Sequence, residues 1–302
     1  MEVLKVISLA KTKDEIKRGW FVKRYPLKKY QNYLIEKLPY KLEEKEYYGE
    51  KVDNIILQMT KEELDQYEKE FVQEYIQKVL AKLNIIHPHY EEELKAYLPK
   101  EEDRTWIMKY IVFPELYQQI IQENQMEHTD INLVLIDSGD RKIQFLLENL
   151  IEDLNHLTII TNRESHFEKF VDAVFEETGL MVEIISTPIT ELIKGNLVVD
   201  ASTESCKMYR YFDKDAIVID MTSDKEKLMY LYGRRKDLQI ICDMEISLRG
   251  EAAKKDLVTE ILCCKYWNLY KFVYKENEIC SGSELLFYQK MHHIKLEKLI
   301  KL

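Results

Sequence analysis

The stretch Ile131–Thr161, INLVLIDSGDRKIQFLLENLIEDLNHLTIIT, decides the fold of this chain. Its first part, Ile131–Asp137, is a short aliphatic run of the kind found in a buried strand. Asp140–Leu154 then carries apolar residues at the three- and four-residue spacing of an amphipathic helix. Leu157–Thr161 is a second short aliphatic run. This succession of strand, helix and strand predicts a βαβ unit with two parallel strands.

The same alternation continues towards the C-terminus. Four more short apolar runs predict strands, at Leu180–Ile185, Leu197–Asp200, Ala216–Met221 and Leu238–Cys242. Helical patterns lie between or after them, at Glu164–Thr178, Thr190–Lys194, Ser223–Tyr232 and Glu251–Trp267. Six buried strands separated by helices indicate an α/β fold with a mostly parallel sheet covered on both faces. Because crossovers between parallel strands are right-handed, we expect a doubly wound sheet of order 3-2-1-4-5-6.

The chain before residue 130 has longer helical patterns. Thr60 and Glu63 form a predicted capping box at the start of a helix that extends to about Asn84. A further helix is expected over Asp103–Gln125, interrupted near Pro114. Glu2–Leu9 and Val52–Met59 are candidate strands.

The polar residues 127–130 separate the two patterns, and we place the domain boundary there. Residues 1–130 are expected to form a helix-rich N-terminal domain. Residues 131–302 are expected to form the α/β domain, which the pattern over Glu284–Leu302 predicts to end in a C-terminal helix.

Composition excludes several classes of protein. The 302 residues are 46% hydrophobic and 32% charged, which is typical of a chain with a folded core. A formal charge of −10 argues against a general nucleic-acid binder. No apolar run is long enough to span a bilayer, so no transmembrane segment is expected. The five cysteines are odd in number and contain no C-x-x-C pair, which favours a reducing, cytoplasmic location.

The turn after the first strand of the α/β domain is the first candidate ligand site. Ligands of doubly wound sheets bind beyond the carboxyl ends of the strands, and dinucleotide sites there use a G-x-G-x-x-G turn. The corresponding stretch of this chain, DSGDRK, retains only Gly139. Arg141 and Lys142 carry charges that suit phosphate, whereas Asp140 repels it. After the second strand, Arg163 stands where an arginine contacts the 2′-phosphate of NADP.

A family resemblance rests on three stretches. The order IITNRESHFEKF (159–170), LVVDAS (197–202) and AIVIDMTSDKE (216–226) resembles the Rossmann nucleotide-binding domain of shikimate dehydrogenase and glutamyl-tRNA reductase. The resemblance covers about residues 132–243. It implies that the cofactor groove would be lined by Gly139, Asn162, Arg163, Ser202 and Thr203. The chain departs from the family because most of its glycine-rich turn is missing, and no counterpart of the family's catalytic residues is recognisable.

Two further sites are possible on residue type alone. The stretch Asp137-x-Gly139 fits a shortened methyltransferase turn, but that site needs a carboxylate after the second strand. His87 and His89, with the acidic residues 91–93, offer metal-binding groups, but we favour the start of a helix, which explains both Pro88 and the acidic first turn.

The segment from residue 11 to residue 29 holds eight basic residues against two acids, with aromatic residues interleaved. We interpret it as a solvated face; the alternative is a local anionic partner.

The alternation of strands and helices is preserved, whereas the glycine-rich turn is degenerate. This combination favours a non-catalytic, Rossmann-like protein with a regulatory or interaction role. Its partner is unidentified: another protein or a second copy of the chain. The alternative is an NADP-dependent oxidoreductase in which Arg163 reads the 2′-phosphate.

Overall fold

The computed structural model describes residues 3–12, 27–99, 103–140, 142–150, 154–275 and 280–302. The chain forms two compact units. Unit 1 contains residues 1–103 and 260–267, and unit 2 contains residues 104–259 and 268–302. Two of the helices before residue 130, α5 (Trp106–Ile111) and α6 (Phe113–Glu123), therefore belong to unit 2. The domain boundary at residue 130 stays a prediction.

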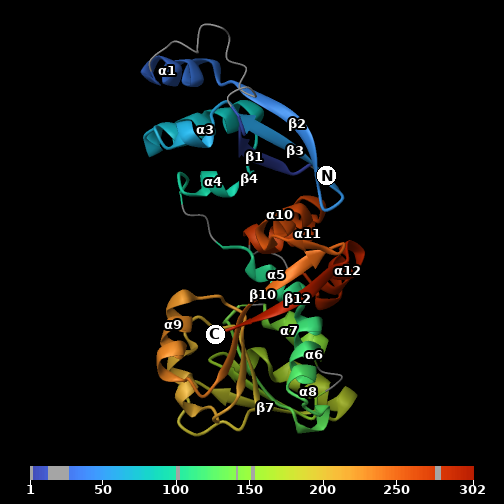
Figure 1. The fold of residues 1–302 in the computed structure, drawn as a ribbon. Helices are drawn as coiled ribbons and strands as arrows, with labels where there is room; N and C mark the ends of the chain where they lie inside the picture. The colour runs from blue at the N-terminus through green and yellow to red at the C-terminus, as the bar shows by residue number, and fades with distance from the viewer. Residues whose placement is uncertain (1–2, 13–26, 100–102, 141, 151–153, 276–279) are drawn as a thin grey trace. The chain divides into compact units, whose positions relative to one another are not determined.

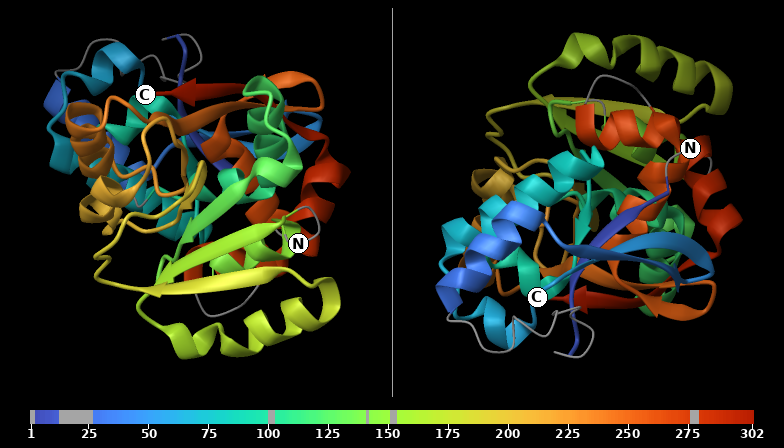
Figure 2. Two further views of the ribbon diagram at one scale, coloured as in Figure 1. Left: turned by 90° about the horizontal axis from the view of Figure 1, so that it is seen from below. Right: turned by 90° about the horizontal axis from the view of Figure 1, so that it is seen from above.

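Unit 2 is built on one large sheet, whose strands lie side by side in the left view of Figure 2. Six strands follow one another from one edge in the order β7-β6-β5-β8-β9-β10, and every neighbouring pair in this series is parallel. The predicted order 3-2-1-4-5-6 and the doubly wound α/β fold are thereby confirmed. The strands are β5 (Asn132–Ile136), β6 (His156–Thr161), β7 (Met181–Ser186), β8 (Leu197–Asp200), β9 (Ile217–Asp220) and β10 (Gln239–Leu248).

Helices connect most of the strands and cover the sheet. Those that connect the first three strands are α7 (Ile143–Leu150) and α8 (Glu168–Thr178). On the opposite face, side chains of α9 (Lys225–Arg234), of the 3-10 helix Ser205–Tyr211 and of the loop 187–196 join one apolar cluster with the strands. Both faces of β8 and β9 are buried, which explains why these strands read as unbroken apolar runs.

The C-terminus corrects the predicted closing helix. The helix α12 (Gly282–His292) ends at His293, whose φ of 50° is left-handed, and β12 (Ile294–Lys301) follows. β12 pairs antiparallel with β10. The spacing of the apolar residues in IKLEKLIK suits either a helix or a strand. The segment forms a strand because one side of β10 is available for pairing. On its other end β10 turns into β11 (Glu251–Ala253), also antiparallel.

Two further predicted helices differ from the structure. Thr190–Lys194, predicted as a helix, is an irregular segment in which Ile193 forms an isolated bridge with Phe212. The predicted interruption near Pro114 is confirmed, since α5 ends at Ile111 and α6 begins at Phe113. The pattern over residues 251–267 resolves into β11, α10 (Lys255–Lys265) and the start of α11 (Trp267–Lys275).

Unit 1 contains a second, four-stranded sheet of order β2-β3-β1-β4 (Figure 1). The strands are β1 (Lys5–Leu9), β2 (Tyr40–Tyr47), β3 (Glu50–Leu57) and β4 (His89–Tyr90). β1 runs parallel to β3 and to β4, and β2 forms an antiparallel hairpin with β3. The sheet packs with α1 (Leu27–Lys37) and α3 (Lys69–Leu83) around a core that includes Ile55, Leu57 and Tyr75.

Two expectations for unit 1 change. The capping box forms, with the Thr60 amide donating to Glu63 at 3.1 Å, but α2 (Lys61–Leu64) is a single turn separated from α3. Pro88 does not begin a helix. It precedes β4, which pairs with β1, and the short helix α4 (Glu92–Lys95) starts after it.

Candidate functional site

The five predicted groove residues lie in loops at the carboxyl ends of three adjacent strands. Gly139 follows β5, Asn162 and Arg163 follow β6, and Ser202 and Thr203 follow β8. Because the sheet order places β5 between β6 and β8, the fold brings these loops together at the carboxyl ends of the strands. Ligands of doubly wound sheets bind at this end of the sheet.

The turn after β5 is held together by its own carboxylates. Gly139 has a φ of +79°, which suits glycine, and its amide donates to Asp137 Oδ1 at 3.1 Å. Asp140 Oδ1 accepts from the Lys142 amide at 2.8 Å and from the Ser138 hydroxyl at 2.5 Å. Burial acts to raise the pKa of Asp140, but these hydrogen bonds and Lys142 outweigh it and leave the pKa below its ordinary value. The anionic carboxylate of Asp140 therefore lies in the turn that a pyrophosphate would approach.

Arg163 is bound by Asp137. Its Nε and Nη2 atoms donate to the two carboxylate oxygens of Asp137 at 2.7 and 2.8 Å, a bidentate ion pair. The Asp137 side chain is 1% exposed and that of Arg163 is 24% exposed. Thr161 also donates its hydroxyl to Asp137 at 2.7 Å. The hydrogen bond to Asp137 raises the pKa of Arg163 above its ordinary value, so the guanidinium remains charged and directed at this carboxylate.

The remaining predicted residues have simpler surroundings. Asn162 and Thr203 are exposed. Ser202 is half-buried; its amide donates to Asp200 Oδ1 at 2.9 Å and its hydroxyl accepts from the Glu204 amide at 3.1 Å. Ser202 thus shapes the turn after β8.

A buried ion cluster lies behind this turn, and the sequence analysis missed it. Lys227 Nζ is 2.7 Å from Asp200 Oδ2 and 2.7 Å from Asp220 Oδ1, and the three side chains are at most 1% exposed. Ser205 donates to Asp200 at 2.5 Å, and the Tyr209 hydroxyl donates to the same carboxylate. Burial lowers the pKa of Lys227, but Asp200 and Asp220 outweigh it, and the net pKa lies above its ordinary value. The Lys227 ammonium is therefore charged.

A second buried lysine joins the cluster from α5. Lys109 donates to the backbone carbonyls of Asp220 and Cys242, each at 2.7 Å, and its Nζ is 3.8 Å from Asp220 Oδ2. Desolvation lowers the pKa of Lys109, with Asp220 acting against it. Two lysines and two aspartates thus meet in the interior of unit 2.

A sequence signal for this cluster existed. Both LVVD and IVID end a buried run with aspartate, and Asp200 pairs in register with Asp220. Two neighbouring carboxylates buried at one edge need cations. Lys109 within the apolar helix WIMKYI is one such cation. Lys227 follows Lys225 and Glu226 in the charged first turn of α9, so it carried no comparable signal.

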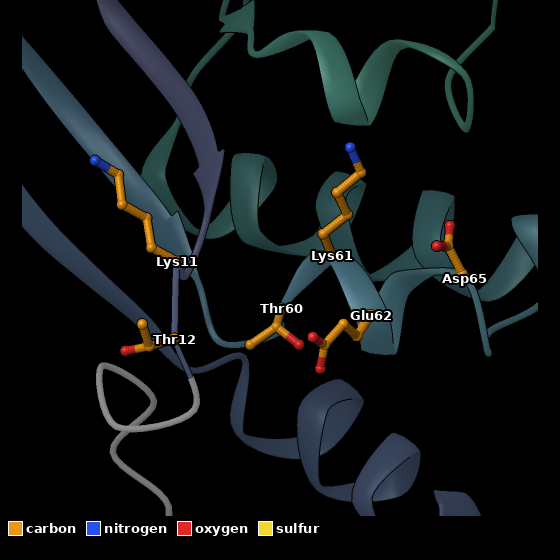
Figure 3. A pocket seen from close by; sticks show the side chains of 6 residues that line it. All are labelled: Lys11, Thr12, Thr60, Lys61, Glu62 and Asp65. Carbon is orange, nitrogen blue, oxygen red and sulfur yellow. The ribbon is translucent and has the colours of Figure 1, made fainter.

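Unit 1 has a pocket of about 580 Å³ beyond the carboxyl ends of β1 and β3, lined by Lys11, Thr12, Thr60, Lys61, Glu62 and Asp65. Figure 3 shows Lys11 and Thr12 beyond the end of β1 and the other four residues around α2. Its two lysines and two carboxylates balance, so its net charge selects no sign of ligand. Of the basic segment 11–29, residues 13–26 lie outside the described residues.

The described ranges contain neither a cluster of metal ligands nor a membrane-spanning helix. Within them, no three His, Cys, Asp or Glu side chains are grouped as metal ligands, and the residues around His87 and His89 form no such group. The five cysteines are free thiols. No helix in the described part of the chain has the length and apolarity needed to cross a membrane.

The chain is similar to several solved structures. No protein-family model matches the chain, and no curated protein matches it. The L-tryptophan dehydrogenase from Nostoc punctiforme is similar with 8% identity and a TM-score of 0.37, over 95% of this chain and 78% of that one. Shikimate dehydrogenase 1 from Peptoclostridium difficile is similar with 10% identity and a TM-score of 0.31, over 96% and 98% of the two chains.

A third structure is the shikimate 5-dehydrogenase from Listeria monocytogenes in complex with shikimate and NAD. It is similar with 9% identity and a TM-score of 0.32, over 96% of this chain and 95% of that one.

Proposed function

We propose that this chain is a non-catalytic protein with a regulatory or interaction role, built on a dinucleotide-binding architecture whose groove is filled by its own ion pairs. The observation that carries the proposal is the bidentate pair between Arg163 and the buried Asp137. Arg163 is the residue that a bound NADP would need at its 2′-phosphate.

The groove residues do not fit a dinucleotide. A 2′-phosphate would have to displace Asp137 from Arg163, leaving a carboxylate that is 1% exposed without its cation. Removing one partner of a buried pair costs about 3–5 kcal/mol. Asp140 and Asp137 would also oppose the pyrophosphate by like charge. We therefore assign no step of chemistry to a nicotinamide cofactor here.

The test is a titration of the full chain with NADPH and with NADH, in which isothermal calorimetry measures binding. We expect no saturable binding of either nucleotide. An Arg163→Ala variant serves as the control for nonspecific binding and should behave like the wild type. Micromolar binding of NADPH that disappears in Arg163→Ala would instead establish the oxidoreductase alternative.

An interaction role requires a partner, either another protein or a second copy of this chain. Native mass spectrometry of the untreated full chain measures its oligomeric state and detects any ligand that co-purifies. The five free thiols and the charge of −10 suit the expected cytoplasmic location and the expected absence of nucleic-acid binding.

A further inference from the structure

The strand β7 is an open edge of the large sheet (left view of Figure 2). It pairs with β6 on one side, and no strand in the described part of the chain pairs with its other side. The amide of Thr187, just past β7, donates to the carbonyl of Thr161 in β6, so the odd-numbered residues direct their backbone groups towards β6. These directions alternate along a strand. The N–H and C=O groups of Val182, Ile184 and Ser186 therefore point away from the sheet, where an added strand can pair with them.

β7 lacks the features that protect the other edge strands of this protein. Proteins block open edges with lysines or prolines, or by keeping the edge strand very short. In unit 1, β2 carries two lysines and β4 has two residues. In unit 2, β12 carries three lysines and β11 has three residues. The sequence of β7, MVEIIS, contains neither lysine nor proline, and four of its six residues are apolar. This edge is therefore suited to pairing with a strand from another molecule.

The apolar side chains at this edge are poorly covered. No residue of β7 is buried, and Met181 is 70% exposed. In α8, which packs against β7, Val174 alone is buried and Phe175 is 59% exposed. Val182 and Ile184 are half-buried. Because removing apolar surface from water is favourable, a strand added to β7 gains free energy from these side chains as well as from backbone hydrogen bonds.

Charge decides between a second copy of the chain and another protein. The exposed charged residues of α8 and β7 are one lysine, Lys169, and five acids, Glu168, Asp172, Glu176, Glu177 and Glu183. Within the described ranges, no lysine or arginine forms an ion pair with any of the five carboxylates. Two copies joined through β7 would bring two acidic surfaces together, whereas a basic strand neutralises one of them.

We propose that β7 pairs with an extended segment of another protein, in which apolar and basic residues alternate. The backbone of that segment bonds to Val182, Ile184 and Ser186. Its apolar side chains lie beside Val182 and Ile184, and its basic side chains lie beside Glu183 on the other face of the sheet. The inference rests on the proposed interaction role and names the chemistry of the partner. Nucleotide binding tests the groove and peptide binding tests this edge, so the two can fail separately.

The probe is the peptide acetyl-KVKVKV-amide, titrated into the full-length protein and followed by NMR of the backbone amides. We expect saturable binding with an affinity of roughly 0.1–1 mM, in keeping with so short a peptide. Hydrogen exchange should slow at the amides of Val182, Ile184 and Ser186. The peptide acetyl-EVEVEV-amide should not bind. Equal binding of the two peptides, or no protection of these amides, would overturn the proposal.

Two modified peptides test the backbone pairing itself. One carries methyl groups on the amide nitrogens of its three lysines, and the other on those of its three valines, so each loses the donors along one of its edges. Because only one edge of the peptide faces β7, one of the two should fail to bind and the other should bind like the unmodified peptide. Binding of both would contradict strand addition.

Two substitutions locate the site. Ile184→Pro removes an outward amide, a position at which edge strands tolerate proline, and should weaken the lysine peptide at least about tenfold. Glu183→Gln should weaken it about threefold, whereas Glu251→Gln, which changes an exposed glutamate on β11, should leave binding unchanged. Thermal unfolding of each variant verifies the fold. A dimer of the full chain that dissociates in Ile184→Pro would place a second copy on this edge and overturn the choice of partner.

Discussion

The ammonium of Lys227 is stable in the interior because aspartates end two neighbouring strands in the same register. Asp200 and Asp220 approach it from β8 and β9, and Ser205, Tyr209 and backbone groups satisfy the remaining oxygens. A buried charge is tolerated only with such complete pairing. The cluster therefore makes the arrangement of the loops after β8 and β9 specific.

Lys227→Met should destabilise the protein strongly. It leaves two buried carboxylates without their shared cation, and breaking a buried pair in this way costs about 3–5 kcal/mol. Lys225→Met, at an exposed position of the same helix α9, should change the free energy of unfolding by less than about 0.5 kcal/mol. Urea denaturation monitored by circular dichroism measures both. A similar effect of the two substitutions would contradict the role of the cluster.

Asp220 should make stability sensitive to acid. Burial acts to raise its pKa, but Lys227 and Lys109 outweigh burial, so the folded pKa lies below the ordinary value of 3.8. A depressed folded pKa contributes stability above the unfolded value, and this contribution is lost as the pH falls through the folded pKa. We expect the free energy of unfolding to decrease as the pH is lowered below about 4.

The comparison of variants isolates this carboxylate. Asp220→Asn should show a weaker decrease in unfolding free energy between pH 5 and pH 3, whereas the exposed Asp213→Asn should follow the wild type. Urea unfolding at several pH values within this window provides the measurement. An unchanged pH profile for Asp220→Asn would show that the pairing contributes nothing.

At the scale of elements, the loop 187–196 replaces a crossover helix by a few anchored residues. Ile189 and Ile193 supply apolar contact, and the amide of Ile193 donates to the carbonyl of Tyr211 at 2.8 Å. Gly195 allows the backbone to approach the sheet at Val134, which is fully buried. A close approach of this kind has little tolerance for added volume.

Gly195→Ala should therefore cost about 1–3 kcal/mol, because the added methyl group overlaps a side chain that is packed on all sides. Gly233→Ala is the control: Gly233 lies in α9 with no atom close to the added Cβ, and alanine favours the helix by about 1 kcal/mol. Thermal unfolding of the two variants should shift in opposite directions. A neutral Gly195→Ala would mean that the loop can move away from the sheet.

At the scale of the whole molecule, the two units differ from the linear division of the sequence. Residues 260–267 return to unit 1, while α5 and α6 belong to unit 2. α5 and α6 bury Ile107, Tyr110 and Phe113, and α5 carries Lys109 into contact with two strand ends. A fragment that begins at residue 131 loses these groups.

Residues 104–302 should consequently fold cooperatively, whereas residues 131–302 should not. The shorter fragment exposes apolar surface of unit 2 and leaves Asp220 without Lys109. Urea denaturation of the two fragments, with the full chain as reference, checks this expectation. Equal cooperativity of both fragments would support the boundary at residue 130.

The sequence alone determined the strand order of unit 2. Buried parallel strands must be apolar on both faces, so the runs ending at Asp137, Thr161 and Asp200 were visible without coordinates, and the handedness of crossovers left one order. It also placed Gly139 and Arg163 at one edge of the sheet. β2, by contrast, was missed because no residue of the edge strand YKLEEKEY is buried.

Tertiary structure decided what these residues contact. Arg163 meets Asp137 across 26 positions of sequence, and Lys109 meets Asp220 across 111. A pattern of residue types predicts local geometry, but it does not name partners that come together only when strands align. The same reason applies to β12, because its sequence suits two periods and only the unpaired side of β10 makes it a strand.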